Sequence, residues 1–432
     1  MEISTEKLKQ VVPMLPHRRY NIFSGTNTWA EWRTMFRALL GGHPIDDQEL
    51  IGRYQAAFAK TVNATHASSF GAGRMALYAI LEALDIGEGD EVIVPAFTCV
   101  VVPNAIIYRG ARPVYVDIEA ISFNINSHLL EQAITERTRA IIAQHTFGVA
   151  CDLDTIKGIA SRYKDIAVIE DCGHALGARY NGRNVGAIAD VGFFTTDHSK
   201  ITSTIFGGMT TTNNDALAAR IDEIQSRTPF LKMSQHKRLL LTFLVEYPLY
   251  SPSILWLGRT IVPALWETRL LFAWRDELSL KKPENPVWPT QLSSQQARLG
   301  LSQLGSLQKN LSHRRKIASM LESHLRWSGM DADQLNDPSW LRYSFLVSNR
   351  KEFERRFARH FDLGTWFTSI AHGRHHDLGS IGYVKGSCPT GELVAKHIVN
   401  LPTHLRIPAK TIEVEVLKHR DWLKDQIMVN PE

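Results

Sequence analysis

The sequence predicts an α/β protein with a large, mostly parallel sheet and a smaller α+β region at the C-terminal end. Three observations carry this prediction. Short apolar segments alternate with amphipathic ones between about residues 61 and 213, helical spacing then continues to residue 280, and a long helix follows that leads into another strand-like run. Short apolar strands joined by helices are typical of a parallel sheet covered on both faces.

The predicted strands of the large region are short and rich in β-branched residues. They cover residues 91–97, 112–118, 140–146 and 166–171, and the run "VGFFTT" follows at 191–196. Amphipathic patterns between them, such as 75–84 and 152–164, predict helices. This alternation indicates a sheet built by successive crossovers.

The second half of the chain changes in character. Residues 215–280 have helical spacing and unusual aromatic weight, and three prolines then indicate a linker: Pro283, Pro286 and Pro289. A long helix is predicted from Gln291, ahead of the strand "RYSFLVSN". We therefore predict an N-terminal extension (1–47), a large domain (48–285, with a helical insertion at about 228–285) and a small C-terminal domain (286–432).

Composition restricts the function classes. The 432 residues carry a net charge of only +5, and no basic run is interleaved with aromatic residues, so nucleic-acid binding is disfavoured. Four scattered cysteines lack the spacing of a metal site or a disulfide framework and favour a reducing cytoplasm. The N-terminus has no apolar core of a signal peptide, and no uncharged stretch approaches the roughly 20 residues of a spanning helix.

The segment "GAGR", residues 71–74, precedes a helical pattern. Glycines at a helix start leave backbone N–H groups free to approach an anion, and the helix dipole favours negative charge. A phosphate site is therefore one interpretation, and a tight turn is the other. A nicotinamide dinucleotide site is disfavoured, because the spacing is not GxGxxG and no convincing strand precedes it.

Polar residues follow two of the predicted strands. Glu170 and Asp171 end one strand, where open α/β sheets place ligand contacts, and His174 follows. Lys200 follows the next strand and precedes the pair Gly207-Gly208. Taken singly, these residues have plainer interpretations: a turn-capping acid, a loop histidine and a solvated lysine.

Together, the three signals match the requirements of pyridoxal 5'-phosphate. The glycine turn would hold the phosphate, the acid would keep the pyridine nitrogen protonated, and a partly desolvated lysine would form an imine with the aldehyde. The combination is far more specific than any of its parts.

The chain also resembles the sugar aminotransferases of the DegT/DnrJ/EryC1/StrS family from about Gln48 onward. The matching phrases include "ALDIGEGDEVIVPAFTCVVVPNAIIYRGARPVYVDI", "VIEDCGHALGARYNGRNVGAIADVGFF" and "CPTGELVAKHIVNLPTH". The resemblance implies the aspartate-aminotransferase-like fold (fold type I) and a homodimer with active sites near its interface. It is weakest between residues 228 and 289.

Residue roles are implied by position in that family. Lys200 matches the Schiff-base lysine and proton carrier, Asp171 the partner of the pyridinium, and His174 the contact near the phenolic oxygen. Gly73, Arg74 and Met75 match the backbone around the phosphate, and Thr195 the hydroxyl that joins them. No metal ligand is implied.

The sequence also departs from the family pattern. Arg74 replaces a hydroxyl residue of the phosphate cup, and Phe206 stands where a glutamate usually precedes the glycine pair. Cys99 aligns with the aromatic residue that stacks on the cofactor ring, with Phe97 two residues away as the alternative. The asparagine that a partner subunit usually supplies aligns near Pro289, with Gln291 as a weak substitute.

The predicted function is an aminotransferase that converts a nucleotide-linked keto sugar into an amino sugar, with glutamate as donor. The alternatives are a sugar dehydratase of the same fold, which the resemblance disfavours because such enzymes replace the lysine with histidine, and a non-catalytic regulatory or binding relative. The aromatic excess between residues 239 and 274 would be hard to cover on a monomer. It is interpreted as a packed insertion, or else as a surface for at most peripheral membrane attachment.

Overall fold

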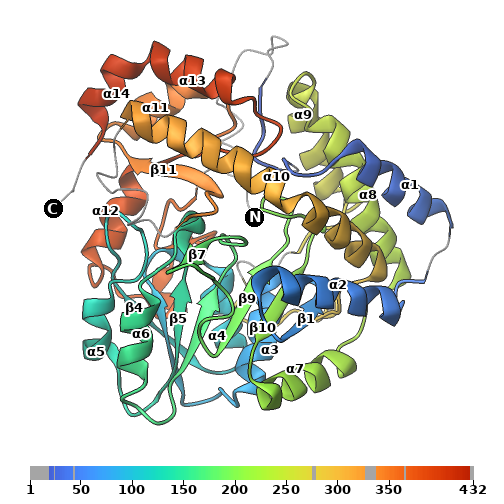
Figure 1. The fold of residues 1–432 in the computed structure, drawn as a ribbon, viewed down its shortest axis with the longest axis vertical. Helices are drawn as coiled ribbons and strands as arrows, with labels where there is room; N and C mark the ends of the chain where they lie inside the picture. Colours follow the sequence, from blue (N-terminus) through green and yellow to red (C-terminus); the bar gives the residue numbers. More distant parts are fainter. Residues whose placement is uncertain are drawn as a thin grey trace.

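A seven-stranded sheet with helices on both sides forms the larger part of the molecule (Figure 1). The structure is a computed structural model that describes residues 19–23, 25–41, 44–274, 279–325, 337–363 and 366–428. The predicted 1–47 extension therefore lies partly outside the described residues.

The sheet is mostly parallel, as predicted. Its strands, in spatial order, are β1 (His66–Phe70), β10 (Gly208–Thr212), β9 (Val191–Thr195), β6 (Ala167–Asp171), β5 (Thr138–Gln144), β2 (Glu91–Pro95) and β4 (Arg112–Val116). β10 pairs antiparallel with both of its neighbours, whereas β9, β6, β5, β2 and β4 pair in parallel. The carboxyl ends of β6 and β9 therefore lie side by side.

Alternate residues of the central strands enter two different cores. Val92 and Val94 of β2 face one core with Ile142 of β5, whereas Ile93 and Ile141 face the other. The first core is covered by α3 (Gly73–Ala83), α4 (Val101–Tyr108) and α7 (Asp215–Arg227), and the second by α2 (Gln48–Val62), α6 (Leu153–Ala160) and part of α10 (Ser294–Leu325). Burial on both faces explains why these strands read as continuous apolar runs.

Polar caps fix where several of the covering helices begin. Asp47 accepts a hydrogen bond from the N–H of Leu50 at α2, Asp152 from that of Thr155 at α6, and Asn214 from that of Leu217 at α7. Such caps satisfy N–H groups that have no partner inside the helix.

The C-terminal region forms a third core around the second half of α10. Its antiparallel strands are β11 (Arg342–Leu346) and β13 (Ile398–Pro402), and its helices are α11 (Arg350–Phe357), α12 (Pro389–His397), α13 (Ala409–Lys418) and α14 (Arg420–Gln426). Ile317 and Leu321 of α10 pack in this core with Phe345 and Leu401. One long helix thus joins the cores of both regions.

Short elements complete the fold. They are α1 (Trp29–Gly41), α5 (Leu130–Ala133), the paired strands β3 (Thr98–Cys99) with β12 (Ala371–His372) and β7 (Arg179–Tyr180) with β8 (Arg183–Asn184), and 3-10 turns at Ser127–Leu129, Thr146–Gly148 and Leu378–Ile381. The β3–β12 pair is parallel and links the large sheet region to the C-terminal region.

The aromatic segment forms α8 (Met233–Leu249) and α9 (Leu255–Glu267). Phe243, Tyr247, Phe272 and Trp274 are buried within this single chain, whereas Trp256 is 45% exposed. The expectation that this aromatic excess needs a partner chain for cover is therefore wrong for most of its residues. α8 packs on α1, where Trp32 Nε1 donates to the carbonyl of Leu244 at 2.9 Å.

One local expectation was wrong. Strand β1 directly precedes the "GAGR" turn, although no convincing strand was predicted there. Its sequence, "HASSF", lacks the β-branched residues that mark strands, and its pairing along the whole length of β10 supplies the stabilisation instead.

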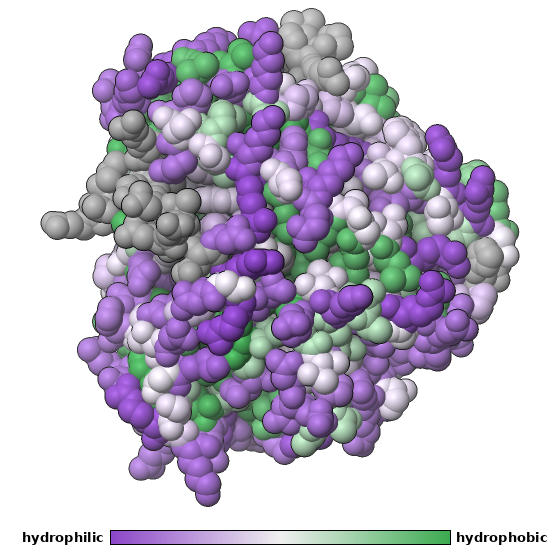
Figure 2. Space-filling model, viewed as in Figure 1, coloured by the Kyte–Doolittle hydropathy of each residue, from purple (hydrophilic) through white to green (hydrophobic). Residues whose placement is uncertain are grey.

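The face shown in Figure 2 is mainly hydrophilic. Hydrophobic residues gather in one area of it, around the part of α10 that lies between α2 and α8 (Figures 1 and 2). Among the residues described, no helix combines the length and apolar character that crossing a membrane requires.

Candidate functional site

Lys200 lies in the loop between β9 and β10. The N–H of Thr204 donates to the carbonyl of Thr196 at 2.8 Å, and the hydroxyls of these two residues lie 2.6 Å apart. The N–H of Lys200 donates to the carbonyl of Asp197 at 3.0 Å. The hydroxyl-rich stretch therefore closes the loop on itself and holds Lys200 at the strand end.

Gly208, after the loop, and Gly73, at the start of α3, permit a close backbone approach. A Cβ atom at Gly208 would collide with the carbonyl of Ala72, immediately before α3. A Cβ atom at Gly73 would lie 2.6 Å from Cβ of Thr195. Glycine at both positions brings the start of α3 against the end of β9.

The Lys200 side chain is partly buried and approaches an aromatic ring. Its Nζ lies 4.3 Å from the centroid of the Trp366 ring, which belongs to the C-terminal region. Burial lowers the pKa of Lys200 to about 8, and the carboxylates of Asp197 and Asp171 oppose that shift only in part. A lysine in this range supplies neutral amine near neutral pH far more readily than a solvated lysine does.

Asp171 is the last residue of β6 and is 7% exposed. Its Oδ1 accepts a hydrogen bond from the N–H of Gly173 at 2.9 Å. Burial raises the pKa of Asp171, and the Gly173 N–H and the charge of Lys200 act against it. The carboxylate is thus placed at the sheet edge beside the end of β9.

His174 lies between aromatic rings. Its ring stacks on Phe147 at 5.6 Å and on Trp366 at 5.3 Å, with interplanar angles of 6° and 13°. Burial lowers the pKa of His174 well below its usual value, and the nearby charge of Lys200 adds to the shift. Its Nδ1 accepts the N–H of Phe147 at 3.2 Å, so the proton of the neutral ring is on Nε2.

The start of α3 carries no side-chain cap, because its N-cap residue is Ala72. The N–H of Met75 donates to the Ala72 carbonyl at 3.0 Å, whereas Thr195 lies against Gly73. Arg74 is partly exposed. The start of α3 therefore lies at the same edge of the sheet as Thr195, Asp171 and Lys200.

The two candidates for covering the cofactor ring lie in different surroundings. Phe97 is fully buried in an aromatic cluster and packs edge-on against Phe367 at 5.1 Å. Cys99 keeps some exposure in β3, where it pairs with His372, and its thiol contributes to the pKa of Lys200. Of the two, Cys99 therefore keeps some exposure, whereas Phe97 is enclosed by other aromatic rings.

The side chains at two other positions that depart from the family pattern, Phe206 and Gln291, make contacts within the chain. The ring of Phe206 packs against His198 at 5.5 Å and Phe272 at 6.1 Å. Gln291 Nε2 donates to the carbonyl of Thr228 at 2.7 Å.

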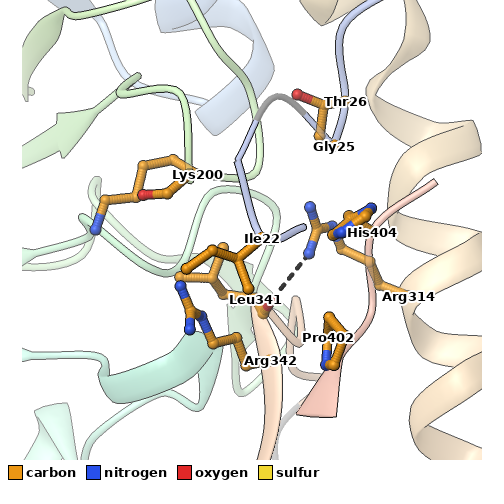
Figure 3. A pocket seen from close by; sticks show the side chains of 10 residues that line it. Ile22, Gly25, Thr26, Lys200, Arg314, Leu341, Arg342, Pro402 and His404 are labelled. Carbon is orange, nitrogen blue, oxygen red and sulfur yellow. Dashed lines mark hydrogen bonds between the residues drawn. The ribbon is translucent and has the colours of Figure 1, made fainter. Parts of the chain in front are cut away.

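A small pocket beside Lys200 contains residues that the sequence reasoning missed (Figure 3). Ile22, Gly25 and Thr26 come from the segment before α1, Arg314 from α10, Leu341 and Arg342 from β11 and its approach, and Pro402 and His404 from the end of β13. Trp366 was also missed. No local signal marks these residues, because each reaches the site through long-range packing.

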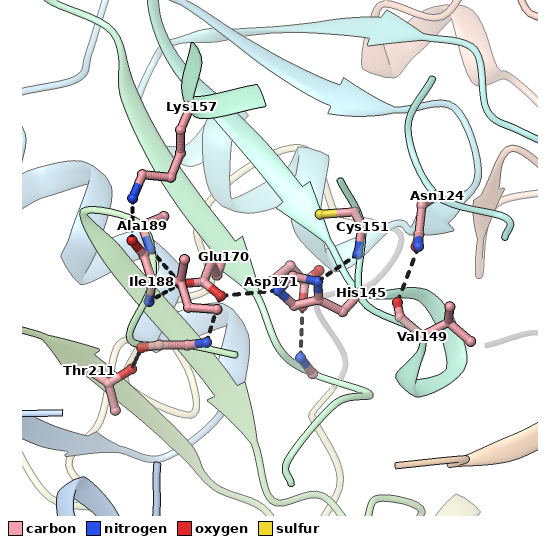
Figure 4. A network of polar contacts seen from close by, with 12 residues as sticks. Asn124, His145, Val149, Cys151, Lys157, Glu170, Asp171, Ile188, Ala189 and Thr211 are labelled. Atoms are coloured by element: carbon pink, nitrogen blue, oxygen red, sulfur yellow. Dashed lines mark hydrogen bonds and ion pairs between the residues drawn. The ribbon is translucent and has the colours of Figure 1, made fainter. Parts of the chain in front are cut away.

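Glu170, the residue before Asp171 in β6, belongs to a second network of polar contacts (Figure 4). Its carboxylate accepts the N–H groups of Gly186 (2.6 Å), Ile188 (2.8 Å) and Ala189 (2.7 Å), and lies 3.2 Å from Nε2 of His145. His145 and Glu170 form, with Cys172, a buried group of metal-ligand types. Protein donors already fill the acceptor capacity of Glu170, so the network braces the strand.

The profile of the DegT/DnrJ/EryC1/StrS aminotransferase family matches residues 30–238 and 284–416. The gap between the two matches holds most of α8 and all of α9.

Curated relatives match over a shorter stretch. GDP-perosamine synthase of Caulobacter vibrioides is 42% identical over 171 residues, which are 40% of this chain and 46% of that protein. A dTDP-3-amino-3,6-dideoxy-alpha-D-galactopyranose transaminase of Aneurinibacillus thermoaerophilus is 38% identical over 44% of this chain and 50% of its own length. The matches thus cover about half the length of these relatives.

Among solved structures, an aminotransferase from Psychrobacter cryohalolentis superposes with a TM-score of 0.71 at 21% identity, over 96% of this chain and 99% of that chain. This likeness confirms the predicted aminotransferase fold.

Proposed function

Because this chain belongs to the DegT/DnrJ/EryC1/StrS aminotransferase family, we propose that it is a pyridoxal-phosphate-dependent sugar aminotransferase. It would convert a nucleotide-linked keto sugar into the amino sugar, with glutamate as amino donor. The named activities of the Caulobacter and Aneurinibacillus relatives support this substrate class. The observation that carries the proposal is the meeting of Lys200, Asp171 and the uncapped start of α3 at one sheet edge.

The residues at this edge fit the cofactor. Gly73 lies so close to Thr195 that a side chain there would clash, so the backbone at the start of α3 comes up against the Thr195 side chain. The N-terminus of α3 favours a dianionic phosphate at this place. Gly73, Arg74, Met75 and Thr195 would hold that phosphate, with the Met75 N–H the weakest contributor because it already has a partner.

Bound pyridoxal phosphate supplies a reactive aldehyde and a ring that accepts an electron pair. Asp171 would hold a proton on the ring nitrogen, and its carboxylate is fixed for this by Gly173. His174 would donate from Nε2 to the phenolic oxygen, and Cys99 would cover the ring.

Lys200 would anchor the cofactor and would then carry a proton on its Nζ. Its lowered pKa suits an amine that takes a proton from the donor's carbon and returns it to the cofactor side. Trp366 covers the amine from the C-terminal region and excludes water from it.

Absorbance spectroscopy tests the proposal. The purified protein should be yellow, borohydride should abolish the imine band, and L-glutamate should convert the cofactor to its pyridoxamine form. A screen of keto-sugar nucleotides then identifies the acceptor. A colourless protein that takes up no pyridoxal phosphate would refute the proposal.

We also propose a homodimer in the cytoplasm. Exposed apolar side chains on α1 and α9 support an interface between copies: Trp29, Phe36, Leu40 and Trp256. The four cysteines form no disulfide, which supports a reducing compartment: Cys99, Cys151, Cys172 and Cys388. Light scattering that gives a monomer of 48.7 kDa would contradict the dimer.

The proposed division at 1–47, 48–285 and 286–432 is supported by the separate core around β11 and β13. Limited proteolysis that cuts near residue 285 checks the second boundary.

A further inference from the structure

A second cavity, of about 410 Å³, lies at the edge of the sheet opposite to Lys200. Ile188, in its wall, precedes β9, and Asn213, also in its wall, follows β10, which runs antiparallel to β9. Lys200 follows the other end of β9, a strand of 5 residues that spans roughly 16 Å. This amino-edge cavity is therefore separate from the candidate catalytic site.

Three basic side chains line the amino-edge cavity. They are Lys60, from the end of α2, and Arg179 and Arg183, from the β7–β8 hairpin. In the part of the chain that the structure describes, no aspartate or glutamate belongs to the lining. Of the three cations, only Arg183 lies within ion-pair distance of a carboxylate of the described chain, at 3.3 Å from Asp154. Cations gathered around one cavity repel each other, so the cavity suits a negatively charged ligand.

Lys157 of α6 adds positive charge to the same wall. Its Nζ donates to the carbonyl of Ile188 at 2.6 Å, as Figure 4 shows. This partner is neutral, so the hydrogen bond fixes the position of the ammonium group without cancelling its charge.

Asparagine side chains supply the other polar groups of the lining. Asn213 Oδ1 accepts the N–H of Thr65 at 2.8 Å, and its Nδ2 donates to the carbonyl of Ala187 at 3.1 Å, so this amide ties the walls of the cavity together. Asn63 and Asn184 line the cavity as well. An amide offers both donors and an acceptor, which suits the hydroxyl groups of a sugar.

The lining also argues against a nucleotide base. Among the residues described, it contains no aromatic side chain on which a base could stack. Its apolar members are small or aliphatic, such as Val62, Ala187 and Ile188. The ligand is therefore recognised through its charge and its hydroxyl groups.

We propose that the amino-edge cavity is a second ligand site, which binds a phosphorylated sugar. The guanidinium groups of Arg179 and Arg183 match the geometry of a phosphate, and the asparagine amides match the sugar hydroxyls. The volume falls in the range of small-molecule sites, roughly 300–1,000 Å³. The inference goes beyond the proposed aminotransferase function and does not depend on it.

Calorimetric titration of the purified full-length chain with glucose 1-phosphate tests the site. Wild type should bind this probe, and Arg179→Gln should weaken binding about tenfold, because a charged hydrogen-bond partner of the phosphate is lost. Arg162→Gln is the matched control, because Arg162 pairs with Glu131 at 2.6 Å outside the lining and should leave the affinity unchanged. Absence of binding to wild type overturns the proposal. Equal affinity in Arg179→Gln and wild type also overturns it, because the probe would then bind elsewhere.

A second variant keeps the test valid if Arg179→Gln does not fold. Asn63→Asp places a carboxylate on the wall at almost unchanged size, and the left-handed backbone of Asn63 (φ 60°) accommodates aspartate. Repulsion of the phosphate should weaken glucose 1-phosphate binding about tenfold. Unchanged affinity in this variant overturns the proposal.

Two further probes decide the class of ligand. Inorganic phosphate should bind about tenfold more weakly than glucose 1-phosphate, because it lacks the hydroxyl groups that the amides recognise. Equal affinity for the two would show a plain anion site and overturn the assignment to a sugar. Tighter binding of adenosine 5'-monophosphate than of glucose 1-phosphate, abolished by Arg179→Gln, would assign the cavity to a nucleotide and overturn it as well.

Discussion

The carboxyl edge of the sheet gathers charged groups, whereas the α8–α9 insertion is built mainly of apolar side chains. At the sheet edge, Lys200, Asp171 and Arg342 are held with shifted pKa values or without partners. In the insertion most buried side chains are apolar, and α8 joins the same core as α3. The candidate catalytic groups therefore lie where the strands end, and the insertion contributes mainly apolar side chains to the core.

Glu246 links the insertion to the loop that carries Lys200. Glu246 of α8 is 1% exposed, and its Oε2 lies 3.0 Å from Nδ1 of His198, in the lysine loop. Burial opposes protonation of His198, but the charges of Asp197 and Glu246 prevail and raise its pKa to about 9. The insertion thus holds the loop that carries Lys200 by a buried ion pair, although the family profile does not extend over it.

The largest effect is expected at Lys200. Lys200→Ala should lower the rate of cofactor conversion by L-glutamate about 10⁴-fold, because the variant loses both the anchor and the proton carrier. Stopped-flow absorbance measures this rate. Lys164→Ala, at an exposed site on the same region, is the control. If Lys200→Ala kept normal turnover and an unchanged borohydride-sensitive band, the residue that anchors the cofactor would have to lie outside this loop.

Asp171→Asn should reduce turnover about 10³-fold while the protein still binds pyridoxal phosphate. A neutral amide no longer holds the ring nitrogen protonated, which removes the electrostatic stabilisation of the developing charge. Asp165→Asn provides the matched exposed control. Near-wild-type turnover of Asp171→Asn would show that Asp171 only caps the turn after β6.

Glu246→Gln tests whether the insertion braces the site. At pH 6 the substitution should cost about 2 kcal/mol of unfolding free energy, because it leaves His198 without its counter-charge. Urea unfolding measures the difference, and the exposed Glu267→Gln should change little.

The pH dependence of this cost has a defined sign. His198 has a folded-state pKa of about 9, above its unfolded value of about 6.5, so its stabilisation is complete below pH 6.5 and is lost as the pH rises through 9. The difference between wild type and Glu246→Gln should therefore shrink between pH 6.5 and 9. A difference that stays constant over this range would show that packing, not the ion pair, holds the loop.

The smallest effect is expected on the outer surface of the insertion. Trp256→Ser should change stability by less than about 0.5 kcal/mol, whereas the buried Trp274→Ser should cost about 3 kcal/mol. Co-sedimentation with anionic liposomes at low salt completes the comparison. We expect wild type to stay in the supernatant, and binding that Trp256→Ser abolishes would assign α9 to a membrane surface.

Much of the fold was predictable because its signals are local. β2, β4, β5 and β6 lie within a few residues of their predicted bounds, since an apolar β-branched run between helices has few alternatives. β1 was missed because pairing with β10, and not its own composition, makes it a strand.

The site was predictable to the same extent. Asp171 and Lys200 follow neighbouring strands, and the carboxyl ends of parallel strands share one edge, so their proximity follows from chain order. Arg342, Trp366 and Thr26 gave no such signal. Each comes from a segment far from Lys200 in the sequence, and nothing in its local pattern distinguishes it from a core or surface residue.

The sequence by itself determined the parallel sheet, the lysine and acid at its edge and the glycine turn at the start of α3, because these depend on periodicity and backbone geometry over a few residues. The tertiary structure alone decided that Trp366 and Arg342 lie beside the lysine, that the segment before α1 closes the pocket and that Glu246 holds the loop. Those contacts arise because α10, β11 and α8, which belong to different cores, meet around the lysine loop and its pocket, where burial shifts the pKa values of the charged groups.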